Sequence, residues 1–97
     1  MQVKEIGIIE VSLIMRSFSL EDYNKLTVFE SDFRKAVDSR YARSFTRSEF
    51  DVINQVYYQT LNRNANMSCG GCVLQMLTSV GRLYFNFKNN LSQDTES

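Results

Sequence analysis

The sequence predicts a small all-α protein, a single domain of three to five helices. The chain of 97 residues has no proline and only four glycines, so it lacks the turn residues that closely spaced β-hairpins require. Apolar residues recur every three or four positions, as on helices with one buried face. A chain of this length supports one modest core. We assign the helical domain to residues 1–91, with residues 1–17 as a possible docking arm and 92–97 as a frayed polar tail.

Residues 2–17 are compatible with either a helix or a strand. Every second residue from Ile9 to Met15 is apolar, which is typical of a strand. The same residues can form a helix with a polar stripe. A single strand would have no partner in a helical chain, so we favour a helix, and we name Ile8 as a candidate interface residue in this arm.

Residues 20–42 have apolar side chains every three or four positions, and they follow a sequence typical of a helix N-cap. Ser19 followed by Asp22 resembles an N-cap with an acid in the first turn. Thr27 and Val28 can weaken the middle of such a helix, and a restart at Ser31-Asp32 is possible. One long helix and two short ones are both compatible with the pattern.

A helix is predicted over residues 47–61. Thr46 and Glu49 have the spacing of a capping box, in which each side chain accepts from the backbone of the other residue. Phe45 and Phe50 occupy the positions of a hydrophobic staple on either side of this cap.

The last helix is predicted over 69–87, with Ser68 as its cap. The short loop before it predicts an antiparallel hairpin with the 47–61 helix. Gly81 lowers helix propensity, which indicates a close helix crossing. The residues expected to meet across the hairpin are Phe50, Ile53, Tyr57 and Leu61 on one side and Val73, Leu77, Val80 and Tyr84 on the other.

Cys69 and Cys72 are the two cysteines of the chain, and the chain has no histidine. As neighbours on one helix face, they could pack as small apolar side chains, with Gly70 and Gly71 allowing close backbone approach. They could also form a redox pair at a helix N-terminus or share a metal between chains. An intracellular protein would keep both as thiols.

Residues 33–47 contain five basic side chains and one acidic one, although the whole chain has no net charge. Basic and aromatic residues alternate there, as in surfaces that grip phosphates and stack on bases. The alternative is that Tyr41 and Phe45 face the core while the arginines are solvated or pair with acids. The acids expected in these pairs are Asp38, Glu49 and Asp51. The candidate nucleic-acid contacts in the basic segment 34–47 are Arg40, Tyr41, Arg43 and Arg47.

No reaction is indicated by the remaining residues. Without histidine, a Gly-rich phosphate loop or apposed carboxylates, we expect no enzyme, no cofactor, no resident metal and no small-molecule substrate. The apolar run Ile6–Met15 is half a membrane span and contains Glu10, so we expect a cytoplasmic protein without a membrane partner. The expected partner is a protein or further copies of the chain, with Tyr58 and Phe85 as candidate interface aromatics.

Three ordered segments also carry a resemblance to a known group of proteins. They are Tyr41–Glu49, Asn66–Leu74 with its Asn-x-x-Cys-x-x-Cys pattern, and Leu83–Phe85, with Tyr57 between the first two. Together they resemble small helical proteins of unknown function encoded by tailed bacteriophages and prophages of gut Bacteroidetes, over about residues 41–87. The resemblance implies a viral or mobile-element origin and a non-enzymatic role in the virion, in packaging or on host machinery. It also implies that Asn66, Cys69 and Cys72 form a loop clasp at a helix cap.

Overall fold

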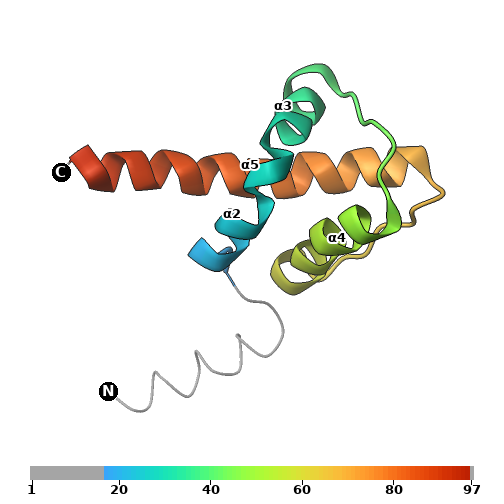
Figure 1. The fold of residues 1–97 in the computed structure, drawn as a ribbon, viewed down its shortest axis with the longest axis horizontal. Coiled ribbons are helices and arrows are strands. Elements are labelled where there is room, and N and C mark those ends of the chain that lie inside the picture. Colours follow the sequence, from blue (N-terminus) through green and yellow to red (C-terminus); the bar gives the residue numbers. More distant parts are fainter. Residues whose placement is uncertain (1–16, 97) are drawn as a thin grey trace, which may run out of the picture.

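The structure is a computed structural model that describes residues 17–96, with side chains described for 17–91. The described residues contain no strand, which confirms the all-α prediction. The predictions for residues 2–16, including Ile8, lie outside the described residues. The elements in chain order are α2 (Leu20–Leu26), the 3-10 helix η1 (Thr27–Phe29), α3 (Glu30–Ser39), α4 (Arg47–Leu61) and α5 (Gly70–Glu96) (Figure 1).

Helix α5 is the element on which the others pack. Its most extensive contacts are with α3, followed by those with α4 and α2. The other helices lie against its N-terminal and middle parts, and its C-terminal part extends beyond them (Figure 1). The molecule is therefore built around one long helix.

The segment 20–42 forms two helices with a 3-10 turn between them. Ser19 caps α2 in a capping box with Asp22, as the sequence indicates. The break falls at Thr27–Phe29, where the β-branched side chains disfavour a continuous helix. Helix α3 ends at Ser39, and the left-handed backbone of the next residue, Arg40 (φ 55°), lets the Tyr41 N–H donate to the carbonyl of Lys35 at 3.2 Å.

Helix α4 has the predicted bounds and the predicted cap. Thr46 Oγ1 accepts from the Glu49 N–H at 3.2 Å, and Glu49 Oε1 accepts from the Thr46 N–H at 2.9 Å. Asn62 ends the helix in the left-handed conformation (φ 57°), which asparagine adopts more readily than most residues.

The core collects side chains from every element. Seven of the eight residues expected to meet between α4 and α5 belong to it, and Leu61 packs against it partly buried. Its members are Leu26, Phe29, Phe33, Ala36, Phe50, Ile53, Val56, Tyr57, Val73, Met76, Leu77, Val80 and Tyr84.

Gly81 lies where α3 crosses α5, as its position in the sequence indicates. A Cβ atom at Gly81 would be 3.0 Å from the Cβ of Phe33 and 3.3 Å from a methyl of Val37. The absent side chain therefore allows the two helices to pack closely.

Two predictions about the ends of α5 are wrong. The helix begins at Gly70 rather than directly after Ser68, because Cys69 rather than Ser68 makes the capping contacts described below. At the other end, the helix was expected to end at Phe87, and it continues through Glu96. No glycine or proline follows Phe87 to stop the helix. The polar composition of the last residues therefore did not predict where α5 ends.

Candidate functional site

Arg43, a candidate nucleic-acid contact, is bound by two carboxylates of the same chain. Its guanidinium donates to both oxygens of Asp32 at 2.9 and 3.2 Å, and to both oxygens of Glu49 at 3.4 Å. It also lies 4.1 Å from the centre of the Phe45 ring. The hydrogen bonds with Asp32, and then with Glu49, raise the pKa of Arg43. Arg43 therefore ties the linker before α4 to α3.

Of the other three candidate nucleic-acid contacts, Arg47 has protein partners, whereas Arg40 and Tyr41 are exposed. Arg47 contacts Asp51 at 3.5 Å and the sulfur of Met67 at 3.6 Å. Arg40 and Tyr41 are exposed in the linker between α3 and α4. Two of the three candidate arginines, Arg43 and Arg47, therefore pair with acidic residues of the same chain. This agrees with the alternative that the arginines of the basic segment pair with acids. Phe45 packs against the core, whereas Tyr41 does not.

Sequence reasoning missed Asp32 as the main partner of Arg43. Asp32 is almost fully buried on α3, eleven positions before the arginine. The available signal was an acidic residue next to Phe33 on the apolar stripe, since a buried carboxylate requires a cationic or hydrogen-bonding partner.

Cys69 and Cys72 form a disulfide at the start of α5, with their Cα atoms 5.2 Å apart. The prediction of two thiols is therefore wrong for this structure. It was argued from the cellular compartment, whereas three-residue spacing at a helix start brings the Cα atoms within bonding range. Neither cysteine is fully buried, and a Cβ atom on Gly70 or Gly71 would meet nothing within 4 Å. The expected close backbone approach at these glycines is absent.

The residues before the disulfide make a network of capping bonds. Asn66 Oδ1 accepts from the N–H and the hydroxyl of Ser68 at 3.0 and 2.8 Å, and the Asn66 carbonyl accepts from the Cys69 N–H at 2.9 Å. Cys69 Sγ then accepts from the Cys72 N–H at 3.1 Å. Asn66 and Cys69 thus satisfy backbone groups that the start of a helix leaves without partners.

A groove of about 340 Å³ lies beside the disulfide. It is bounded by the linker before α4, by the start of α4 and by the start of α5. Most of its lining is apolar, and Arg43 and Ser44 add polar groups. The lining residues are Ala42, Arg43, Ser44, Phe45, Phe50, Met67, Gly70 and Val73.

Glu30 joins α3 to the middle of α5. It accepts from the Tyr84 hydroxyl at 2.6 Å and from Lys88 Nζ at 2.7 Å. The hydrogen bond from Lys88, followed by that from Tyr84, lowers the pKa of Glu30. Burial raises the pKa of Tyr84, and the bond to Glu30 adds to the effect.

The two candidate interface aromatics have different surroundings. Phe85 is half-buried, with its ring edge-on to Tyr84 at 5.2 Å and the guanidinium of Arg34 over it at 4.7 Å. Tyr58 is 51% exposed on α4. Of the two, Tyr58 presents the more accessible ring to a partner.

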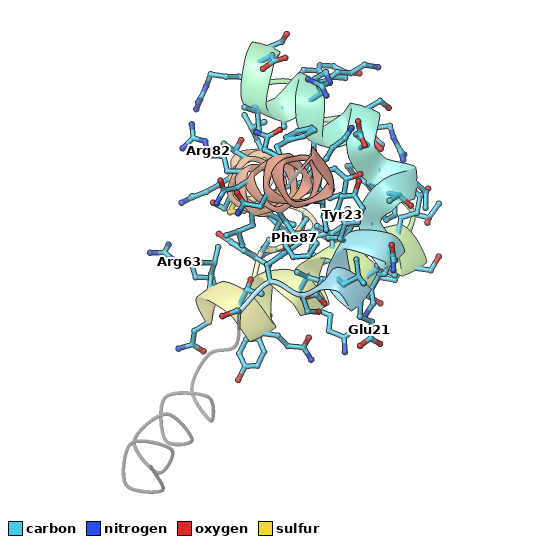
Figure 2. All side chains as sticks on the ribbon, turned by 90° about the vertical axis from the view of Figure 1, so that its left-hand side faces the viewer. Glu21, Tyr23, Arg63, Arg82 and Phe87 are labelled. Carbon is cyan, nitrogen blue, oxygen red and sulfur yellow. A yellow bond between two sulfur atoms is a disulfide. The ribbon has the colours of Figure 1, made fainter. Side chains whose placement is uncertain are left out.

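Phe18 fixes the beginning of the described chain to α5. Its ring is 5.6 Å from that of Phe87, which is also 5.6 Å from Tyr23. Figure 2 shows Tyr23 of α2 next to Phe87 of α5. The described chain therefore begins close to Phe87, near the part of α5 that extends beyond the other helices.

The chain was also compared with known proteins. No family model, curated protein or solved structure matched it. Within residues 17–96, no helix has the length and apolarity needed to span a bilayer. The described residues also contain no group of three or more cysteine or carboxylate side chains that could hold a metal ion.

Proposed function

We propose that this protein is a non-enzymatic assembly protein that binds further copies of itself through residues 1–16 and the extended end of α5. The observation that carries the proposal is the packing of Phe18 on Phe87. It places the start of the described chain, to which the apolar arm is joined in sequence, beside a helix that continues past the other elements (Figure 1). An arm attached there can reach the α5 of a second copy.

The composition of the arm supports the same role. Residues 6–15 contain seven large apolar side chains and one acid. Burying three or four of them would stabilise an interface by roughly 1.5–3 kcal/mol each before the entropic cost of association. In the described residues, every buried side-chain nitrogen or oxygen has a partner. The described core therefore needs no hydrogen bond from the arm, which leaves the arm's apolar side chains as its means of contact.

Further details of the proposal come from the sequence. We retain the antiparallel arrangement of α4 and α5 as the scaffold that holds the core together. The resemblance to phage-encoded proteins supports a phage origin, with a role in the virion, in packaging or in contact with the host. In the described part, Tyr58 is the candidate for additional contacts because half of its surface is exposed.

The contacts of the basic segment argue against the nucleic-acid alternative. Arg43 is bound by Asp32 and Glu49, and Arg47 contacts Asp51. Binding a phosphate would require these pairs to open. We therefore propose no nucleic-acid function.

A charge placed in the arm tests the assembly proposal. Ile8→Asp should weaken self-association at least about tenfold, because one desolvated carboxylate in an apolar interface costs well over 1.4 kcal/mol. Ser12→Asp adds the same charge at a polar position of the same arm and should have a much smaller effect. Sedimentation of each variant over a range of concentrations measures the change, and circular dichroism checks that helicity is unchanged. Equal association of Ile8→Asp and the unaltered chain would contradict the proposal.

A further inference from the structure

We propose that the Cys69–Cys72 disulfide is a reversible redox site that exchanges with a dithiol of a partner polypeptide. The proposal does not depend on self-assembly. The bond closes a ring across only Gly70 and Gly71, and the stabilisation from a disulfide decreases as the closed loop shortens. Both cysteines lie outside the buried core. Breaking the bond therefore removes little that the fold depends on.

The surroundings of the two sulfurs are unequal, and this assigns their roles. Cys69 Sγ accepts the Cys72 N–H at 3.1 Å, at the N-terminus of a helix of 27 residues. A negative charge on this sulfur is favoured by that hydrogen bond and by the helix dipole. Cys69 is therefore the better leaving group in the disulfide and the better nucleophile in the dithiol.

The exchange proceeds in two displacements. A thiolate of the partner attacks Cys72 Sγ, the Cys69–Cys72 bond breaks, and Cys69 leaves as a thiolate. The second thiolate of the partner then attacks the partner sulfur of the mixed disulfide and releases Cys72 as a thiolate. The partner dithiol is oxidised to a disulfide by two electrons, which reduce the cysteine pair, and the two protons lost by the partner thiols are recovered on Cys69 and Cys72.

The groove beside the pair indicates the chemistry of the partner. The groove is lined by Gly70, which lies between the two cysteines in the sequence, and by Val73, which directly follows Cys72. Phe45 and Phe50 also line it. The groove therefore fits a large apolar side chain next to the reacting cysteine of an extended partner segment.

Equilibration with glutathione is the first test. The full chain is incubated in mixtures of reduced and oxidised glutathione, quenched with acid, alkylated and weighed by mass spectrometry. We expect the population to change from disulfide to dithiol across these mixtures, with the circular dichroism spectrum unchanged. A pair that remains oxidised in every mixture would be a structural disulfide, and a pair that remains reduced would not be a disulfide site. Either result would overturn the proposal.

Single-cysteine variants test the assigned roles. In Cys72→Ser, we expect Cys69 at pH 7 to react with iodoacetamide about threefold faster in the folded protein than in denaturant, because a larger thiolate fraction outweighs the lower nucleophilicity of a stabilised thiolate. In Cys69→Ser, Cys72 should show no such acceleration. If folding instead protects Cys69 more than about tenfold, the residue is a packed side chain and the proposal is wrong.

The role of the groove is tested with two cysteine peptides, one with phenylalanine beside the cysteine and one with serine. The phenylalanine peptide should form the mixed disulfide with the oxidised protein at least about threefold faster. Gly70→Leu fills the groove and should abolish this preference. Gly71→Leu is the matched control, since Gly71 does not line the groove. Equal rates for the two peptides with the unaltered chain would contradict the assignment of an apolar partner segment.

Discussion

Single side chains hold together parts of this protein that are far apart in the sequence. The carboxylate of Glu30 binds Tyr84 and Lys88, more than fifty positions later. Arg43 connects the linker before α4 to Asp32 on α3. Hydrogen bonds that involve a charged group are stronger than neutral ones, so these residues set the orientation of α3 against its neighbours.

Glu30 makes the stability of the fold depend on pH in the acidic range. Its folded pKa is lowered, first by Lys88 and then by Tyr84, below the unfolded value of roughly 4.3. The stabilisation it provides is therefore complete above that value and is lost as the pH falls through the folded pKa. We expect the free energy of unfolding to decrease on acidification and Glu30→Gln to make that decrease shallower.

Denaturant unfolding at a series of pH values measures this effect. Glu21→Gln, at an exposed position of α2, is the control and should leave the slope nearly unchanged. Part of the decrease should persist in Glu30→Gln, because Glu49 also has a lowered pKa through its bonds to the Thr46 backbone and Arg43. If the free energy of unfolding decreases equally on acidification in Glu30→Gln and in the unaltered chain, Glu30 does not contribute to the pH dependence.

Gly81 and Gly71 should respond in opposite directions to alanine. At Gly81 the added methyl would lie 3.0 Å from Phe33 Cβ, and overpacking of about 1–3 kcal/mol outweighs the helix-propensity gain of about 1 kcal/mol. We expect a net loss of about 1 kcal/mol. At Gly71 the space is open, so alanine should stabilise by up to about 1 kcal/mol. Urea unfolding of both variants measures the difference, and stabilisation by Gly81→Ala would show that the crossing is not tight.

At the scale of elements, local signals in the sequence predicted α4 best. Its capping box and apolar face depend on residues close in the chain, and the predicted bounds match the structure. The break at Thr27–Phe29 was one of two open alternatives. The extension of α5 to Glu96 was missed, because a polar sequence without glycine or proline does not mark where a helix ends.

The cap of α4 makes a measurable contribution of its own. Thr46→Ala removes the acceptor of the Glu49 N–H and should destabilise the protein by about 1 kcal/mol. Ser48→Ala, in the same turn, is the control, because the Ser48 hydroxyl has only a long contact of 3.4 Å with Thr46 Oγ1. Thermal unfolding of the two variants distinguishes them. Equal stability of both would mean that the first turn of α4 is held by packing alone.

Contacts between elements could not be predicted from the sequence to the same extent. The periodic stripes predicted which residues of α4 and α5 are buried. They carried no information on which acid binds Arg43, since Asp32, Asp38, Glu49 and Asp51 are all close enough in sequence to be candidates. The disulfide between Cys69 and Cys72 was not predicted either, because their spacing allows a disulfide and the expected intracellular compartment favoured thiols.

At the scale of the whole molecule, α5 organises both the core and the proposed assembly surface. It packs against α3 and α4, and its Phe87 contacts Phe18 near the start of the described chain. With no net charge on the chain, long-range electrostatic repulsion between copies is weak. Association then depends on apolar contacts, which the arm supplies.

Native mass spectrometry of the reduced protein tests the assembly proposal most directly. The full chain and a chain beginning at Ser17 are measured at the same concentration, and circular dichroism verifies that both are helical. The account predicts a discrete homo-oligomer for the full chain and a monomer for the shortened one. A monomeric full chain, or an oligomer of unchanged size after removal of residues 1–16, would contradict it.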